Sequence, residues 1–386
     1  MPISSGLLSS LLPTFTAKFM DSLRSQALLT RVVNRDLDPA PMMKGDTVNL
    51  RLPVSVAPVS VTPGSAPVAP QASTTAPVTL TLDRWFERSM GLTDKDVGDF
   101  EAGNMPQQMK QMAVDLVEYI NQDGYALMNQ RAGFTLNTTP ATLPYASTDQ
   151  VFRDAQAQLD IAKAPMQGRI AIHNPMAYWN ALALPNIVQA QFRGDNQNPL
   201  VTGNVGPYLA VPFVGDQLVA SQTTGALGTG ALTVNGVNAA GSLTVSIAKG
   251  AGVSYVAAPG DVITIAGHPR SYVIAAAVTV VQGANTVVTL TAPLAIATVG
   301  SEAITLIGAG TTYNNSLIFH KDAVIFCSRP LIDMEGAGET YTLQDDQTGL
   351  AIRGEITRQH KQVRLAFDCL WGWQTVRASH VGRILG

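Results

Sequence analysis

A stretch at residues 223–312 differs in composition from everything around it and most constrains how the chain can fold. It holds only four charged residues: Lys249, Asp261, Arg270 and Glu302. Short β-branched runs alternate there with Gly, Asn and Pro, and the runs begin at Ala231, Ser242, Asp261, Tyr272, Thr286 and Ala303. Short strands separated by turn residues are typical of a small sandwich or barrel. We therefore predict an all-β domain, Ig-like or barrel-like, at residues 223–312.

This stretch interrupts a domain rather than following one. The segments on either side of it, residues 208–214 and 315–320, are apolar runs that each predict a strand. We expect the two strands to be neighbours in one sheet, which would bring the ends of the inserted stretch close together.

The composition of the whole chain limits the class of protein. With 386 residues, 46% of them hydrophobic, the chain can form two or three domains with cores of their own. A formal net charge of −3 favours neither a basic nucleic-acid binder nor an acidic tail. Charged residues make up 14% of the chain, against about 25% in an ordinary soluble domain. The neutral surface that follows indicates contacts with other protein, although a secreted Thr/Ala/Gly-rich β-protein has the same composition.

Cysteine content and hydropathy bear on the compartment. Cys327 and Cys369 lie in apolar alternating runs, where buried free thiols are expected rather than a disulfide framework. No positively charged region precedes the apolar residues 7–15, so no signal peptide is predicted. The longest apolar run, residues 273–281, is far shorter than the ~20 residues that span a bilayer. We expect a protein that is made in the cytoplasm, stays soluble there and has no membrane partner.

Apolar spacing predicts two helices in the first third of the chain. Phe15, Phe19, Leu23 and Ala27 recur every four residues, and Asp38-Pro39 stops this helix. We expect this arm to dock on its own domain, with docking on a neighbouring subunit as the alternative. A longer helix ends by Gly133, and its apolar stripe comprises Met105, Met109, Met112, Leu116, Tyr119 or Ile120, and Leu127. Methionines in such a stripe indicate core packing rather than a cofactor site.

Strand patterns complete the outline. Residues 48–52 and 78–82 alternate in polarity, which predicts a hairpin-like element with an extended connection stiffened by Pro53, Pro58, Pro63, Pro67, Pro70 and Pro77. Residues 169–173 predict a strand between a helix at 148–164, capped by Ser147 or Thr148, and a helix at 176–184, opened by Asn174-Pro175. Residues 350–357 and 363–374 predict an antiparallel pair, and one face of the second strand carries Val363, Leu365, Phe367, Cys369, Trp371 and Trp373. The mixture is an α+β fold.

No catalytic, cofactor-binding or metal site is predicted. The histidines stand at no metal-ligand spacing, and the sequence contains no nucleophile-elbow, P-loop or dinucleotide motif. They are His173, His268, His320, His360 and His380. We expect His173 to be a structural, hydrogen-bonded histidine and Asp345-Asp346 to lie in a solvated turn. The Gly-rich residues 308–312 resemble a phosphate cradle only superficially.

A mildly basic segment lies near the end of the chain. Between residues 353 and 383, Glu355 and Asp368 are outnumbered by Arg353, Arg358, Lys361, Arg364, Arg377 and Arg383. Such a segment can face nucleic-acid phosphates. A solvated or subunit-contact face is the more common alternative.

The order of these parts resembles that of the major capsid protein of tailed bacteriophages, the Hong Kong 97-type fold. The resemblance is closest to the coat-protein family of Salmonella phage P-twenty-two, which carries an inserted β domain. It covers essentially the whole chain. It rests on the order of elements and on the segments Met1-Pro2-Ile3, 78–83 (VTLTLD), 92–96 (LTDKD) and 319–323 (FHKDA).

The resemblance implies a map of the chain. Residues 1–44 correspond to the N-arm, 45–92 to the E-loop, and 93–164 to the peripheral domain with its spine helix. Residues 165–222 and 313–335 correspond to the axial domain on either side of the insertion at 223–312. Residues 336–386 correspond to peripheral-domain strands and the C-terminal tail.

The resemblance also implies a function. The chain would be a coat protein without enzymatic activity or cofactors, forming hexamers and pentamers of itself in an icosahedral shell. Scaffolding and portal proteins would be its partners, and the shell would enclose non-specifically packaged double-stranded DNA. Assembly would take place in the host cytoplasm and the mature protein would lie in the virion. A surface-layer or adhesin-type β-protein and a cytoplasmic enzyme with an inserted lid are the alternatives.

Overall fold

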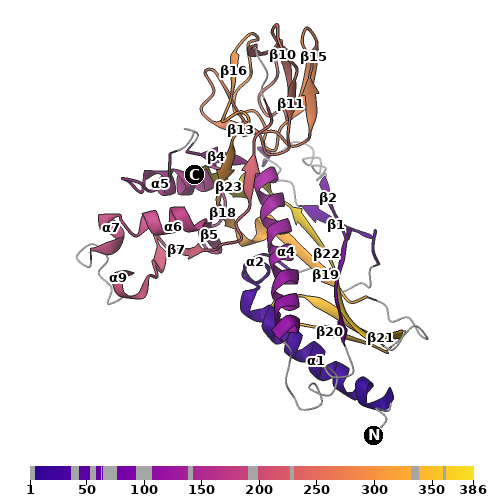
Figure 1. Cartoon of the computed structure of the whole chain (residues 1–386). Helices are drawn as coiled ribbons and strands as arrows, with labels where there is room; N and C mark the ends of the chain where they lie inside the picture. The colour runs from indigo at the N-terminus through magenta and orange to yellow at the C-terminus, as the bar shows by residue number, and fades with distance from the viewer. Residues whose placement is uncertain are drawn as a thin grey trace.

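The computed structural model describes residues 5–35, 43–52, 58–61, 63, 76–92, 107–137, 142–189, 199–226, 230–331, 339–359 and 362–386. In Figure 1, helices α1 (Ser5–Gln26) and α4 (Gln107–Arg131) lie against the sheet that contains β22 (Gln362–Thr375), and the β-rich insertion forms a lobe at the far end of α4. The short helices α5, α6 and α7 lie on the opposite side, around a second sheet. The fold is therefore a mixture of helix and sheet, as predicted.

The N-terminal helix docks on its own chain. Phe15, Phe19, Leu23 and Ala27 are all buried, which confirms the predicted apolar face of α1. Phe19 stacks on Phe367 of β22 with ring centroids 3.9 Å apart. A short helix, α2 (Leu29–Val32), follows directly. The predicted stop at Asp38-Pro39 lies outside the described residues.

The long helix is α4, and its methionine stripe is core. Met109 and Met112 are buried in the largest apolar cluster of the described chain, together with Leu116 and Ile120. The expected start near Met105 lies outside the described residues. Gly124 is a close-approach position: a Cβ there would lie 2.6 Å from Leu29 Cδ2 and 2.9 Å from the Trp373 ring. None of the described helices is long and apolar enough to span a membrane.

A five-stranded antiparallel sheet is organised around β22. Its other strands are β3 (Arg84–Leu92), β19 (Val324–Arg329), β20 (Glu339–Gln344) and β21 (Ala351–Gln359). The pairing of β21 with β22, from Ile352 opposite Cys369 onwards, confirms the predicted antiparallel pair. Strand β3, within the range assigned to the E-loop, was not predicted because most of its side chains are exposed and it has no apolar alternation. Strand β19, within the range assigned to the axial domain, likewise pairs with β22.

The predicted hairpin-like element exists. Strands β1 (Thr47–Leu52) and β2 (Ala76–Thr81) pair antiparallel with Thr47 opposite Thr81, while the Pro-rich connection lies mostly outside the described residues. Leu80 and Leu82 pack with Cys327 and Leu370 on the face of the sheet opposite to α1. Both cysteines are buried and unpaired, as predicted. Burial raises the pKa of the Cys369 thiol to about 12.

A second, six-stranded sheet has the order β4-β23-β18-β5-β7-β6. Its strands are β4 (Phe134–Leu136), β5 (Arg169–His173), β6 (Pro207–Tyr208), β7 (Val211–Gly215), β18 (Ser316–His320) and β23 (Val381–Ile384). The helices beside it are α5 (Gln150–Ile161), α6 (Pro175–Ala181), α7 (Pro185–Val188) and α9 (Pro199–Thr202). The expected N-cap of α5 is wrong by one or two residues, since Asp149 holds that position. Asn174 caps α6 as predicted, accepting a hydrogen bond from Ala177 N at 2.9 Å.

The two strands that flank the insertion are in one sheet but are not neighbours. Strand β5 lies between β7 and β18, parallel to the first and antiparallel to the second. The prediction of direct pairing is therefore wrong, because β5 already satisfies the facing backbone groups of both strands. The two ends of the insertion are instead brought together by the next strands along the chain, because β8 (Ser221–Thr223) pairs antiparallel with β17 (Thr312–Asn314).

The inserted stretch has an apolar cluster of its own. Six antiparallel strands lie in the order β13-β12-β16-β9-β10-β15, and β11 (Tyr255–Ala257) pairs separately with β14 (Val278–Val280). The six are β9 (Leu232–Val234), β10 (Thr244–Lys249), β12 (Val262–Ile265), β13 (Ser271–Val273), β15 (Asn285–Thr289) and β16 (Ala303–Leu306). Buried residues from both sheets, such as Ile247, Tyr255 and Val280, pack together. Sequence patterns predicted these six strands but missed β11 and β14, which form a separate pair.

An ion pair between the partly exposed Arg24 and the buried Asp345 joins α1 to the turn between β20 and β21. Asp345 is 2% exposed and lies 2.6 Å from Arg24 Nη2, so the expectation of a solvated Asp345 is wrong, while Asp346 is exposed. Thr348 Oγ1 also donates to Asp345 Oδ2 at 2.6 Å. Burial opposes ionisation of Asp345, but the hydrogen bonds from Arg24 and Thr348 outweigh it and lower its pKa to about 2.

Replacing Asp345 with Asn removes this stabilisation. The pKa of Asp345 is lower in the folded chain than in the unfolded chain, so its contribution is present above about pH 4 and is lost as pH falls towards 2. We expect D345N to lower the free energy of unfolding by about 2 kcal/mol at pH 7. The difference from the wild type should shrink below pH 4 in urea titrations. Asp346→Asn is the matched control and should change little, since Asp346 is exposed.

The inserted stretch should fold by itself. Its apolar residues contact one another across two sheets, and its ends are held together by the β8–β17 pair. Expressed as residues 221–314, it should unfold in urea with one sigmoidal transition and give dispersed amide NMR signals. A spectrum without dispersion would mean that the host fold shapes this segment.

Candidate functional site

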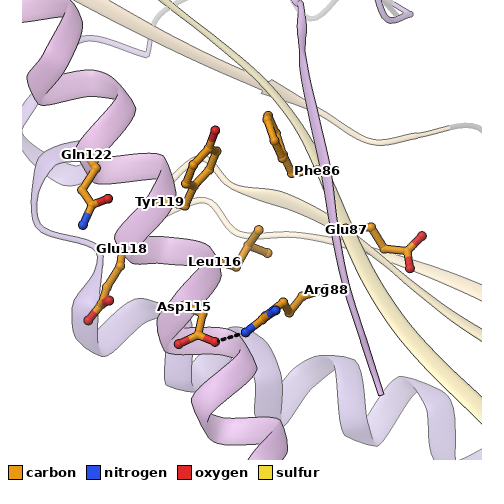
Figure 2. A pocket seen from close by; sticks show the side chains of 8 residues that line it. All are labelled: Phe86, Glu87, Arg88, Asp115, Leu116, Glu118, Tyr119 and Gln122. Carbon is orange, nitrogen blue, oxygen red and sulfur yellow. Dashed lines mark hydrogen bonds and ion pairs between the residues drawn. The ribbon is translucent and has the colours of Figure 1, made fainter. Parts of the chain in front are cut away.

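A groove between β3 and α4 is the first candidate interaction site. It has a volume of about 330 Å³ and is lined by Phe86, Glu87, Arg88, Asp115, Leu116, Glu118, Tyr119 and Gln122. Figure 2 shows Phe86 and Tyr119 facing each other across the groove from the strand and the helix. Their ring centroids lie 4.7 Å apart, and Phe86 also packs on the buried Trp371 at 5.3 Å. Both rings remain partly exposed, at 37% for Phe86 and 42% for Tyr119.

Paired charges close one end of this groove. Arg88 Nη2 donates to Asp115 Oδ2 at 2.6 Å, the contact drawn in Figure 2, and Gln111 Nε2 donates to Asp115 Oδ1 at 2.8 Å. The hydrogen bond from Arg88 lowers the pKa of Asp115, so the carboxylate stays ionised. Both of its oxygens accept hydrogen bonds from these two side chains. A carboxylate in this state is a poor general base. The groove combines aromatic rings with paired charges, which suits contact with another protein segment.

A second exposed apolar surface surrounds α6. Met176 and Trp179 of this helix are each more than half exposed, and Trp179 is 64% exposed. Beside them lies a hollow of about 440 Å³ between α6 and the end of β7, lined in part by Tyr178, Trp179 and Asp216. Neighbouring exposed apolar side chains of this kind mark protein contact sites.

The predicted histidines are scattered, and the described ones are structural. His320 bonds Gln167 O and accepts from Asp322 N, His380 bonds Ala162 O, and His268 bonds the Tyr272 hydroxyl. His360 lies outside the described residues. Within the described chain, no three His, Cys, Asp or Glu side chains are grouped closely enough to hold a metal ion.

His173 is structural but is not hydrogen-bonded as expected. It is buried and stacks on Phe213 with ring centroids 3.8 Å apart, next to Tyr145. Neither ring nitrogen has a hydrogen-bond partner among the described residues. Burial lowers the pKa of His173 to about 3, so the ring is neutral and acts as an apolar core group.

The basic segment does not form one face. Arg383 is 1% exposed, and Arg353 is buried with its Nη2 2.7 Å from Asp368 Oδ2. Arg364 is exposed but pairs with Glu87, and Arg377 is exposed. The side chains of Arg358 and Lys361 lie outside the described residues. The prediction of a surface is therefore wrong for Arg353 and Arg383, which strand alternation and pairing send inward. For the exposed Arg364 and Arg377, both alternatives stay predictions.

Two features escaped the sequence analysis. The aromatic groove is lined by Phe86. Its only signal in the sequence was the pair of aromatic residues Trp85-Phe86 between the charged Arg84 and Glu87. Arg383 stands in the apolar run Val381-Gly-Arg-Ile-Leu385, where an isolated charge indicates an inward-facing residue. The Gly-rich residues 308–312 form a turn in which Thr311 N donates to Gly308 O at 2.9 Å, packed under the Tyr313 ring.

Comparison with solved structures finds chains that are similar to this one. A chain of Mycobacterium phage Che8 matches with a TM-score of 0.52 and 14% identity, covering 93% of this chain and 91% of that chain. The capsid structure of Cyanophage P-SCSP1u matches with a TM-score of 0.48, 12% identity, and 92% and 86% coverage. The mature capsid of bacteriophage PhiM1 matches with a TM-score of 0.43, 10% identity, and 92% and 90% coverage. No family model and no curated protein matches the sequence. The likeness to the Che8 chain shows that the two chains share a fold.

The buried His173 should make the fold sensitive to acid. The unfolded chain takes up a proton on this ring near pH 6.5, whereas the folded chain does so only near pH 3. Stability should therefore fall by about 1.4 kcal/mol per pH unit within that window as pH decreases. In urea titrations between pH 7 and pH 4, the free energy of unfolding of His173→Phe should decrease less with falling pH than that of the wild type. Equal slopes for the two proteins would contradict the assignment.

Proposed function

We propose that this chain is the major capsid protein of a tailed phage, a subunit without enzymatic activity that assembles into an icosahedral shell. The supporting observation is the likeness in fold to the Che8 phage chain, which extends over 93% of this chain and 91% of that one. Fold alone does not fix function, so the proposal also draws on the surfaces of this chain.

The exposed surfaces suit a subunit with more than one neighbour. The groove at Phe86 and Tyr119 lies on the α4 side of the chain, and the apolar surface at Trp179 lies around α6 on the other side (Figure 1). Contacts through two different surfaces are heterologous, and heterologous contacts generate rings and larger assemblies. Exposed aromatic and methionine side chains are enriched at such interfaces.

The finer assignments follow from the resemblance to the Hong Kong 97-type coat proteins. In this proposal residues 1–44 are the N-arm, 45–92 the E-loop, 93–164 and 336–386 the peripheral domain, and 165–222 with 313–335 the axial domain. The insertion at 223–312 makes the coat proteins of the P-twenty-two family the nearest type. Hexamers and pentamers would assemble with a scaffolding protein and a portal in the host cytoplasm, and the finished virion would hold double-stranded DNA.

Assembly can be tested directly. Co-expression with the cognate scaffolding protein should yield closed shells of uniform diameter in negative-stain electron microscopy. Trp179→Ala should reduce shell yield while leaving the circular dichroism and urea midpoint of the isolated subunit unchanged, because Trp179 is 64% exposed. A persistently monomeric wild-type product would contradict the proposal. Flat two-dimensional arrays in place of closed shells would favour the surface-layer alternative.

The shell should be held together without covalent cross-links. Some shells of this fold become covalent when an E-loop lysine attacks a neighbouring asparagine, and residues 45–94 contain no lysine. Boiled particles should therefore run as one band at 40.8 kDa in denaturing electrophoresis. A ladder of cross-linked oligomers would show that another amine supplies the reaction.

A further inference from the structure

A single arginine fills the junction between the insertion and the rest of the chain. Arg383 belongs to β23, a strand between β4 and β18 in the six-stranded sheet, and its side chain is 1% exposed. Figure 1 shows β23 and β4 directly beneath the inserted lobe, next to β13. The guanidinium therefore lies where two structural units meet rather than in the middle of either core.

The guanidinium binds groups from several segments at once. Nη1 donates to Asn129 O of α4 at 3.0 Å and to Gln222 Oε1 of β8 at 2.5 Å. Nη2 donates to Gly260 O, inside the insertion, at 2.7 Å, and more weakly to Thr135 Oγ1 of β4 at 3.4 Å. One planar group thus joins a host helix, a host strand, the connecting ribbon and the insertion.

Gln222 extends this network into the insertion. Its Nε2 donates to Pro259 O at 2.9 Å while its Oε1 accepts from Arg383. Gly260 has a φ of +92°, and a Cβ there would lie 2.1 Å from Gln222 Nε2. The turn at 259–260 is therefore shaped to admit Gln222 and to present both carbonyls outward.

The buried charge of Arg383 makes the junction depend on its hydrogen bonds. Each hydrogen bond of Arg383 goes to a neutral oxygen, and burial lowers its pKa to about 10, opposed by the charge of Asp261. The buried Asp261 carboxylate is occupied within the insertion by Gly225 N, Ala258 N and the Tyr255 hydroxyl. A buried cation is tolerated only while its hydrogen bonds are made. A rotation of the insertion would break the bond from Arg383 to Gly260 O and, beside it, the bond from Gln222 Nε2 to Pro259 O.

The insertion also packs on the host where β13 lies beside β4, and two single hydrogen bonds cross there. Ser271 Oγ donates to Thr135 O and Thr291 Oγ1 donates to Ala132 O, both single hydroxyl contacts. The covalent link is the two-stranded β8–β17 ribbon, three residue pairs long. A two-stranded ribbon alone is marginally stable, so it cannot fix the orientation of a lobe.

We propose that Arg383 is the positioning residue that locks the insertion in one orientation on the host fold, with the β8–β17 ribbon as the hinge. The lock forms only when β23 is seated in its sheet, so the C-terminal strand controls the insertion. The inference rests on the junction alone and does not depend on the capsid assignment.

Hydrogen–deuterium exchange of the full-length chain tests the lock. In Arg383→Met, amides at residues 220–226, 258–261 and 309–315 should exchange roughly tenfold faster or more. The reason is that the junction can then open locally without first breaking the hydrogen bonds of Arg383. Amides of β12 and β16, inside the insertion, should keep their wild-type rates. Unchanged rates at the junction, or equal acceleration of β12 and β16, would overturn the proposal.

Three further variants separate locking from general stability. Arg353→Met breaks another buried arginine contact, with Asp368, and should accelerate β21 and β22 while leaving the junction unchanged. Arg383→Lys keeps the positive charge but loses the planar guanidinium with its several N–H donors. The exchange rates of the junction amides in this variant should therefore lie between those of the wild type and of R383M. Wild-type exchange rates at the junction amides in R383K would show that the charge alone is enough and that the guanidinium geometry has no role. Gln222→Ala serves as the test if R383M fails to fold. It should speed the exchange of the same junction amides, and wild-type exchange rates there would overturn the proposal.

Discussion

The central strand β22 is covered on both faces, and the rest of the host fold depends on this double burial. On one face Phe367, Trp371 and Trp373 pack against α1 and α4; on the other, Leu370 packs against the β1–β2 hairpin. Gly372 lets the hairpin approach, because a Cβ there would lie 2.5 Å from Thr81 O. Because β21, β19 and β3 pair along β22, the position of this one strand aligns the arm, the long helix and the hairpin.

Charges in this chain are few, and several lie inside at junctions between segments. Arg24–Asp345 joins α1 to the β20–β21 turn, Arg353–Asp368 joins two strands, and Arg383 joins the insertion to the host. A buried charge needs its partners in fixed positions, so these residues specify how segments meet. The described surface retains the groove at Phe86 and the apolar surface at Trp179, and aromatic side chains exposed in this way are enriched at protein contacts.

Periodicity predicted elements well where one face is buried. The stripes of α1 and α4, the pair β21–β22 and six strands of the insertion all follow from apolar spacing. The exposed strand β3 carried no such signal, and the patterns also missed the separate pair β11–β14. The candidate site was less predictable, because its groove joins Phe86 to Tyr119, which come close only after β3 pairs with β22 beside α4.

The sequence by itself determined which side of each helix and strand is apolar, that residues 223–312 are all-β, and that no known catalytic motif is present. Only the tertiary structure decided that β5 separates β7 from β18, that β23 is a sheet strand rather than a tail, and that Arg383 and Asp345 lie inside. The physical reason is that strand partners are joined by backbone groups that every residue shares. Burial of a charge likewise depends on partners far away in sequence, as Arg24 is from Asp345. Local periodicity therefore predicts neither the order of strands in a sheet nor which charges are buried.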